Sequence, residues 1–230
     1  MKLNKYNLVA RVYPAVLCSL PILALNFFLL NSYAGEFFSA VGGYKWLGGI
    51  TFSMILIYLL AQIGRFIGKE VFEKIHFSDE LNMPTTKLLL HSDKTYSSEQ
   101  KLNIHSKIAN DFNMTIYTPE QESLNQIHAQ RLIVDCVSLI RGKVKDGHLI
   151  LQHNIEYGFA RNLIGGSVVA VFISIFNLII FGYFLEQFLP FFISLFLAVI
   201  YLLIMAVSRK VIQQYGFRYA KILIQEYLLS

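Results

Sequence analysis

The feature that most constrains this chain is an uncharged, apolar run over residues 164–185. A helix of about 22 residues is roughly 33 Å long, which is enough to cross the hydrocarbon core of a bilayer. The polar stretch 156–163 comes directly before the run and places Arg161 and Asn162 where such a helix would meet the membrane surface. The run therefore predicts a membrane-spanning helix joined without a loop to a polar segment.

Three more apolar runs of span length occur, at about residues 12–33, 46–64 and 190–207. The runs form two hairpins with short connections, and basic residues flank the outer ends of both. Because Lys and Arg accumulate on the cytoplasmic side of a membrane, the pattern predicts four spans, with both termini and the segment between the second and third spans in the cytoplasm. The flanking residues are Lys2, Lys5, Arg11, Arg65, Lys69, Lys74, Arg161, Arg209 and Lys210.

Two prolines, Pro14 and Pro21, lie within the first apolar run. Proline has no N–H and cannot donate to the carbonyl one turn earlier, so we expect it to kink or start a helix. Neighbouring helices must then supply donors to the freed carbonyls if the segment crosses a membrane.

Charge is strongly segregated along the chain. Residues 65–163 hold 12 of the 20 Lys and Arg and 12 of the 15 Asp and Glu, although only 15% of the whole chain is charged. A typical soluble domain is about one quarter charged. The sequence thus predicts an all-α membrane protein: an N-terminal transmembrane hairpin, 1–64, a helical cytoplasmic domain, 65–163, a second hairpin, 164–207, and a cytoplasmic amphipathic helix, 208–230.

Capping signals divide the polar domain into helices. Ser97 is expected to open a helix that runs to about Asn110, and Thr118, followed by proline and acidic residues, a helix that runs to about Arg141. Residues 148–162 are expected to form a short extended piece and then a helix that feeds the third span. The apolar face of the tail fits either the membrane surface or the polar domain.

Motifs of known enzyme chemistry are missing. The chain has no nucleophile elbow, zinc-protease histidine pair, phosphate-binding Walker loop or dinucleotide fingerprint. All six histidines lie in the polar domain, but none pairs at a metal-binding spacing, so ordinary polar histidines are the simpler interpretation. We therefore expect no enzyme, with no catalytic residue, no metal ion and no cofactor.

Asn26 and Asn177 are the main polar residues inside the expected spans. Hydrogen bonding between helices is the simpler role for them, and lining a pore in an oligomer is the alternative. Ionisable residues are almost missing from the spans, which disfavours a proton-coupled transporter.

Basic side chains of the polar domain, and of its joint to the third span, suggest an anionic ligand. Arg161 sits where it can also reach lipid phosphates, and a phosphate ligand bound there would act directly on the third span. A solvated surface balanced by acidic residues is the competing explanation, and it is favoured for residues 141–145. The basic side chains that could converge on such a ligand are Lys69, Lys87, His91, Lys107, Arg131, Arg141, Lys143, Lys145 and Arg161.

Three stretches carry a resemblance to a known family: Gly-Lys-Glu at 68–70, Pro-Thr-Thr…Leu-x-His-x-Asp at 84–93, and Tyr-Gly-Phe-x-Arg-Asn-Leu at 157–163. They resemble motifs of small bacterial four-span membrane proteins of antiphage defence, such as the membrane effectors of Hailong systems. The resemblance covers roughly residues 60–187. The chain departs from the pattern in lacking a Trp after the Gly-Lys-Glu helix and a Tyr-His pair after His91, where Asn-Ile-His stands at 103–105.

The resemblance implies a homo-oligomeric channel in the bacterial inner membrane, with a tetramer as the working number, whose opening depolarises the infected cell. It also implies that the cytoplasmic domain binds a single-stranded DNA oligomer made by a nucleotidyltransferase-like partner enzyme, and that the oligomer holds the channel closed. The candidate ligand-binding residues are then the motif residues Lys87, His91, Arg161 and Asn162, together with Lys69 and Arg131. The residues are compatible with this, because basic side chains contact phosphates irrespective of sequence and Tyr96, Tyr117 and Tyr157 can stack on bases.

Two other classes of function stay open. One is a membrane scaffold or sensor that conducts nothing and recruits a soluble partner through its helical domain. The other, a membrane enzyme acting on lipid or nucleotide, has less support because the sequence contains no nucleophile–base pair or metal set.

Overall fold

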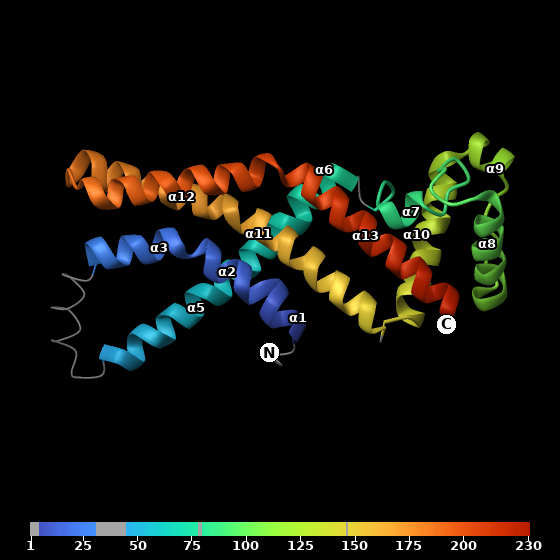
Figure 1. Ribbon diagram of the computed structural model, residues 1–230, viewed down its shortest axis with the longest axis horizontal. Helices are drawn as coiled ribbons and strands as arrows, with labels where there is room; N and C mark the ends of the chain where they lie inside the picture. The colour runs from blue at the N-terminus through green and yellow to red at the C-terminus, as the bar shows by residue number, and fades with distance from the viewer. Residues whose placement is uncertain (1–4, 31–44, 78–79, 146) are drawn as a thin grey trace. The chain divides into compact units, whose positions relative to one another are not determined.

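The computed structural model describes residues 5–30, 45–77, 80–145 and 147–230, and every regular element within them is a helix (Figure 1). The chain divides into two compact units. Unit 1 comprises Met1–Phe72 and Gly158–Arg209, and unit 2 comprises Glu73–Tyr157 and Lys210–Ser230. The end of the expected first span, residues 31–33, lies outside the described residues. The domain limits expected from the sequence stay predictions, because a division of this kind does not locate a membrane.

The N-terminal part of unit 1 is helical but irregular. It consists of α1 (Lys5–Asn7), the π-helical η1 (Leu8–Val12), α2 (Tyr13–Cys18), α3 (Leu20–Leu25) and the π-helical η2 (Asn26–Leu30). Ser19 separates α2 from α3, and its hydroxyl donates to the carbonyl of Val16 at 2.7 Å. The two prolines explain this irregularity, since each lies near the start of a short helix, where a missing N–H is tolerated.

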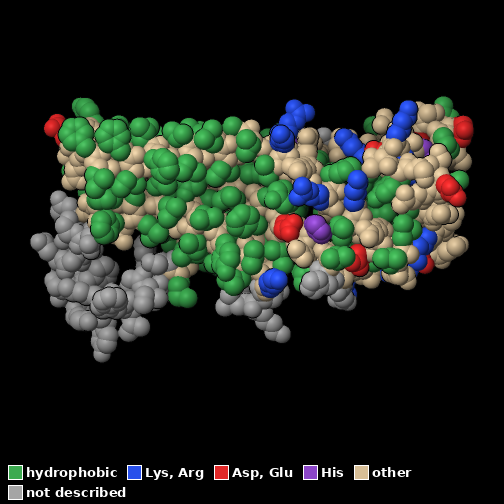
Figure 2. Space-filling model, in the orientation of Figure 1, with side chains coloured by type: hydrophobic (Ala, Val, Ile, Leu, Met, Phe, Trp, Pro, Cys, Tyr) green, Lys and Arg blue, Asp and Glu red, His purple; other side chains and the backbone are tan. Residues whose placement is uncertain are grey.

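The remaining helices of unit 1 are long. They are α5 (Lys45–Phe66) with the π-helical η3 (Ile67–Glu73), α11 (His148–Ile179) with the π-helical η4 (Ile180–Phe184), and α12 (Phe188–Ala206). Three segments of the described chain are long and apolar enough to cross a membrane: Lys5–Leu29, Leu149–Phe184 and Phe188–Ala206. Hydrophobic side chains accordingly cover the visible face of unit 1 (Figure 2). The spanning role of α5 stays a prediction.

Unit 2 is a bundle of shorter helices. They are α6 (Lys74–Phe77), α7 (Pro84–Lys87), α8 (Ser98–Phe112), α9 (Pro119–Leu124), α10 (Gln126–Lys143), the start of α11, and all but the first two residues of α13 (Ser208–Leu229). Its core includes buried residues of α8, α10 and the turn after α7. Ala220, Leu223, Ile224 and Tyr227 of α13 are part of the same core. The apolar face of the tail is therefore buried in unit 2.

Both predicted caps are confirmed, while two other expectations are wrong. The Ser97 side chain accepts from the N–H of Gln100, and Thr118 forms a complete capping box with Gln121. The helix expected from Thr118 to about Arg141 is instead two helices, because the side chain of Asn125 accepts from the N–H of His128 and starts α10. No extended piece precedes residue 162, since α11 already begins at His148.

Candidate functional site

A buried lysine holds the turn that follows α7, residues 88–93. Lys101 of α8 is only 4% exposed. Its Nζ donates to the carbonyls of Leu90, at 2.5 Å, of His91, at 3.3 Å, and of Asp93. Three acceptors match the three donors of an ammonium group, so the buried charge is satisfied. This turn contains the His and Asp of the second resemblance motif.

A buried carboxylate holds the same turn through its N–H groups. Glu122 of α9 is 5% exposed, and its two oxygens accept from the backbone N–H of His91 at 2.7 Å and of Ser92 at 3.0 Å. Burial by itself raises the pKa of Glu122, but these hydrogen bonds outweigh it and leave the pKa below its usual value. The carboxylate therefore stays ionised at neutral pH and fixes the turn together with Lys101.

Two imidazoles meet beside this turn. The rings of His91 and His105 lie 4.8 Å apart, edge to face. Nε2 of His91 is 2.9 Å from the carbonyl oxygen of Tyr117, and Nε2 of His105 is 2.8 Å from that of Leu89. Burial lowers the pKa of His105, and electrostatic interactions with His91 and Lys101 lower it further. His105 is therefore neutral at pH 7 and donates to the turn.

A polar cavity of about 320 Å³ opens next to His91, and Ser92, Glu122, Ser123 and Gln126 also line it. Of the three candidate ligand residues that unit 2 contains, only His91 lines this cavity. Lys87 is exposed at the end of α7, and Arg131 is exposed on α10. His91 is thus part of the scaffold of the turn as well as of the cavity wall.

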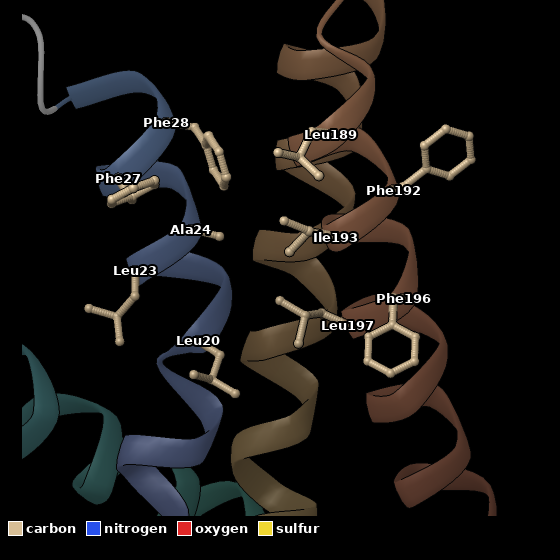
Figure 3. Close-up of a pocket in the computed structure, with 10 residues that line it drawn as sticks. All are labelled: Leu20, Leu23, Ala24, Phe27, Phe28, Leu189, Phe192, Ile193, Phe196 and Leu197. Carbon is tan, nitrogen blue, oxygen red and sulfur yellow. The ribbon is translucent and has the colours of Figure 1, made fainter.

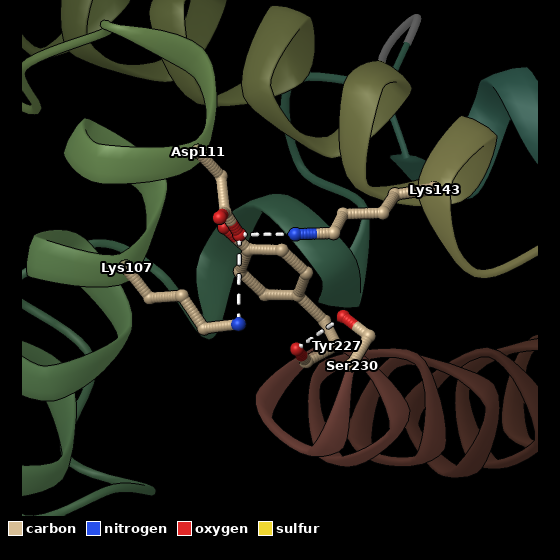
Figure 4. Close-up of polar contacts among 5 residues, drawn as sticks. All are labelled: Lys107, Asp111, Lys143, Tyr227 and Ser230. Atoms are coloured by element: carbon tan, nitrogen blue, oxygen red, sulfur yellow. Dashed lines mark hydrogen bonds and ion pairs between the residues drawn. The ribbon is translucent and has the colours of Figure 1, made fainter.

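The end of α13 is fixed to α8 and α10 by a polar cluster (Figure 4). Nζ of Lys143 donates to Oδ2 of Asp111 at 2.7 Å, and Nζ of Lys107 lies 3.6 Å from the same oxygen. The ring of Tyr227 stacks on Phe112, and both lysine ammonium groups lie over it at 5.3 and 5.7 Å. The hydrogen bond from Lys143 lowers the pKa of Asp111. Charge and stacking together anchor the C-terminal helix within unit 2.

Unit 1 carries the other three candidate residues. Lys69 is exposed on η3, Arg161 is half-buried on α11, and Asn162 is 3% exposed. Asn162 is buried among the helices of unit 1, where its side chain forms a hydrogen bond to another helix.

The crossing of α5 and η3 over α11 leaves no space for side chains. A Cβ added to Gly165 would overlap the carbonyl oxygen of Gly64 and the backbone nitrogen of Gly68. A Cβ added to Gly68 would lie 2.5 Å from the carbonyl oxygen of Arg161. Glycines four residues apart let two helical backbones approach closely, a common arrangement in membranes. The first and third resemblance motifs meet at this crossing.

Asn162 satisfies a carbonyl that a proline cannot serve. Its Nδ2 donates to the carbonyl oxygen of Ala10 at 2.6 Å. Ala10 precedes Pro14 by four residues, so Pro14 occupies the position whose N–H would normally donate to that carbonyl. The sequence predicted a need for such a donor, and α11 supplies it.

Tyr201 does the same for the second proline. Its hydroxyl donates to the carbonyl oxygen of Leu17 at 2.6 Å, and Leu17 precedes Pro21 by four residues. Tyr201 lies on α12 and is 3% exposed. The two carbonyls that lack a proline N–H are thus served by side chains of two different helices.

The two expected pore or packing residues differ in environment. Asn177 is fully buried on α11, and its Nδ2 donates to the carbonyl of Pro21 at 2.8 Å. Asn26 is exposed on η2. Near it, α3, η2 and α12 border an apolar groove of about 620 Å³, toward which Leu189, Ile193 and Leu197 point (Figure 3).

Sequence reasoning missed Lys101, Glu122 and Tyr201. Lys101 carried a usable signal, because it lies three and seven residues before Ile104 and Ile108, on the stripe of α8 that faces the core. A charged residue on an apolar stripe needs buried partners. Tyr201 carried no local signal, since its acceptor lies 184 residues earlier in the chain.

The described residues contain no group of three His, Cys, Asp or Glu side chains that could hold a metal ion. Burial raises the pKa of the Cys136 thiol to about 11, so almost none of it is the reactive thiolate at neutral pH. Comparison of the chain with protein-family models, with curated proteins and with solved structures gives no match.

Proposed function

We propose that this chain is a membrane effector of bacterial antiphage defence that forms a homo-oligomeric, ion-conducting pore and depolarises the infected cell. In this proposal an oligonucleotide, single-stranded DNA made by a nucleotidyltransferase-like partner enzyme, binds the helical domain and holds the pore closed. The helix α5 is the second of four spans, the membrane is the bacterial inner membrane, and both termini and unit 2 lie in the cytoplasm.

One observation carries the gating part of the proposal. α12, the last candidate span, ends at Ala206, and α13 begins two residues later at Ser208. Four residues of α13 are part of the core of unit 2, and the cluster around Asp111 anchors its end. A ligand that changes how α13 packs in unit 2 therefore acts on a helix that is covalently continuous with a span.

The buried polar donors of unit 1 limit any pore to surfaces between copies of the chain. Asn162, Asn177 and Tyr201 all donate to carbonyls of the N-terminal helices. The hydroxyls of Ser167, Ser174 and Ser194 donate within their own helices. Because these donors are used inside the chain, a water-filled path needs surfaces from several copies.

The closed state must be favoured by the ligand's own binding. A ligand shifts a two-state equilibrium only by the difference between its affinities for the two states. A hundredfold shift toward the closed pore requires a difference of about 2.7 kcal/mol.

The test is the membrane potential of cells that make this protein alone or together with its neighbouring gene. We expect depolarisation with the protein alone and recovery with the neighbour. Purified protein in liposomes should release an entrapped dye, and single-stranded DNA should suppress that release. An unchanged membrane potential in cells, together with liposomes that retain their dye, would refute the pore.

A non-conducting scaffold or sensor is the second candidate, and the internal use of the polar donors in unit 1 favours it. Such a protein would leave liposomes intact while retaining a soluble partner in a pull-down through unit 2. Reporter fusions at both termini test the topology common to both candidates, which places them in the cytoplasm.

A further inference from the structure

Unit 2 has a second cavity, of about 380 Å³, between the segment before α8 and the C-terminal half of α13. One wall contains Thr95, Tyr96 and Gln100, and the other contains Lys221, Gln225 and Ile224. None of the three resemblance motifs contributes a residue to the lining of this cavity. Its volume is within the range of small-molecule sites, at the lower end.

The cavity combines an apolar floor with polar groups at its edge. Ile224 is 2% exposed, and Tyr96 packs against the core of unit 2. Burial and the charge of Asp93 raise the pKa of Tyr96, so its phenol remains protonated. Two primary amides, Gln100 and Gln225, add both donors and acceptors. An apolar floor with a few convergent polar groups is typical of a ligand site.

The charge of the cavity edge is positive. Lys221 is exposed, and its ammonium lies 4.7 Å from the centre of the Phe217 ring on the same helix. No acidic side chain lines the cavity. Glu226 of α13 lies beside Gly147, on another side of the helix from Lys221. Asp93 is engaged by the backbone, since its Oδ1 accepts from the N–H of Thr95 at 2.8 Å.

We propose that this cavity binds one nucleotide unit, with the base against Tyr96, base edges on Gln100 and Gln225, and a phosphate on Lys221. An aromatic side chain stacks on any base, a primary amide can donate and accept at a base edge, and a lysine contacts phosphate as a point charge. Each of the three ligand parts thus has a partner in one cavity.

This inference rests on the proposed function, since it names where the gating oligonucleotide is held. It also gives the ligand a mechanical role. The two walls of the cavity come from the start of α8 and from α13, so a bound nucleotide bridges them and secures α13 to unit 2. Loss of the ligand removes this bridge and leaves α13, which continues from the last candidate span, held only by the core and the cluster around Asp111.

The test uses the full chain in lipid nanodiscs and a fluorescein-labelled single-stranded DNA hexamer, with nucleoside monophosphates as competitors. Lys221→Gln should weaken binding about tenfold and reduce the slope of log affinity against log salt by about 0.7, because one phosphate contact to a single strand is lost. Gln225→Ala should weaken binding several-fold and leave the salt slope unchanged. Lys210→Gln, an exposed site on the same helix outside the cavity, should bind within twofold of the wild type.

The outcomes separate the cavity from the pore. If Lys221→Gln and Gln225→Ala both bind the hexamer and gate as the wild type does, the proposed nucleotide site is wrong and the proposed pore is unaffected. Binding that both variants weaken, in a protein that never conducts, would support the cavity and refute the pore. A wild type that binds neither the hexamer nor the monophosphates overturns the cavity. Circular dichroism of each variant confirms that these exposed positions leave the fold intact.

Discussion

Units 1 and 2 satisfy their buried polar groups with different chemistry. In unit 1 the carbonyls of Ala10 and Leu17 accept from the neutral side chains of Asn162 and Tyr201. In unit 2 the turn at 88–93 is held by two charges, a lysine and a glutamate. Both units therefore stabilise an irregular backbone by side chains from another helix, with neutral groups at the carbonyls of Ala10 and Leu17 and with ions at the turn.

The surroundings explain the difference. A charge in hydrocarbon loses its hydration without full compensation, so spans use amides and hydroxyls to complete broken backbone bonds. In unit 2, where charged residues are common, the ammonium of Lys101 has three carbonyl acceptors and the carboxylate of Glu122 has two N–H donors. A buried ion is tolerated when every hydrogen-bonding site is filled.

The comparison also changes the meaning of the sequence motifs. His91 and Asp93 belong to the turn that Lys101 holds, and Asn162 belongs to the bond that replaces a proline donor. These three motif residues therefore have structural roles that require no ligand.

The largest effect is expected at the helix crossing of unit 1. Gly165→Ala adds a Cβ that overlaps the backbone of α5, so the helices must separate. We expect the free energy of unfolding to fall by about 3 kcal/mol, measured by titration with SDS in mixed micelles. Gly142→Ala is the matched control, because a Cβ at Gly142 meets nothing within 4 Å. It should stabilise α10 slightly, and equal losses at the two sites would disprove the tight crossing.

The next effect is expected at the charged turn of unit 2. Lys101→Met keeps most of the side-chain volume but leaves the carbonyls of Leu90, His91 and Asp93 without their donor. We expect a loss of about 2–3 kcal/mol, seen as faster hydrogen exchange over residues 88–96 in the full chain. Lys94→Met, an exposed lysine on the same segment, should leave exchange unchanged. If residues 88–96 of the Lys101→Met variant exchange their amide hydrogens as slowly as in the wild type, the turn does not depend on the buried ion.

A smaller effect tests the neutral bonds of unit 1. Asn162→Ala should cost about 1 kcal/mol, a typical value for a hydrogen bond between membrane helices. In a Pro14→Ala background the same change should cost almost nothing, because residue 14 then has an N–H for the carbonyl of Ala10. Tyr201→Phe and Pro21→Ala form a second cycle of the same kind. Equal losses with and without the proline would show that the side chain does not replace its missing donor.

Local pattern predicted the helices and the two caps, but not the long-range partners. Ser97 and Thr118 mark helix starts through residues within one turn, so sequence alone located them. Asn125, whose side chain caps α10 and whose backbone angles are not helical, was missed because apolar residues continue on both sides of it. The prolines predicted unsatisfied carbonyls, yet nothing near them in the sequence pointed to the donors Asn162 and Tyr201. Such pairings depend on which helices pack together, which a single sequence does not state.

The smallest expected effect is a difference in pH response between the units. The pKa of His105 is below its ordinary value of 6.5, so the unfolded chain binds this proton more readily than the folded one. Stability from neutral His105 is present above pH 6.5 and declines as the pH falls below it. Hydrogen exchange at residues 88–96, corrected for intrinsic rate, should be a few-fold faster at pH 5.5 than at pH 7.5. His105→Gln keeps a donor for the carbonyl of Leu89 and should abolish the change.

Exchange of residues 10–17 in unit 1 provides the internal control for this pH response, because Asn162 and Tyr201 are neutral at both pH values. Glu122 does not confuse the result, since its lowered pKa keeps it ionised at pH 5.5. Equal acceleration in both segments would point to global unfolding and would remove His105 as the cause. Acceleration that is confined to residues 88–96 and that His105→Gln abolishes would instead show that the ionic turn of unit 2 senses acid through His105, while the neutral bonds of residues 10–17 in unit 1 do not respond.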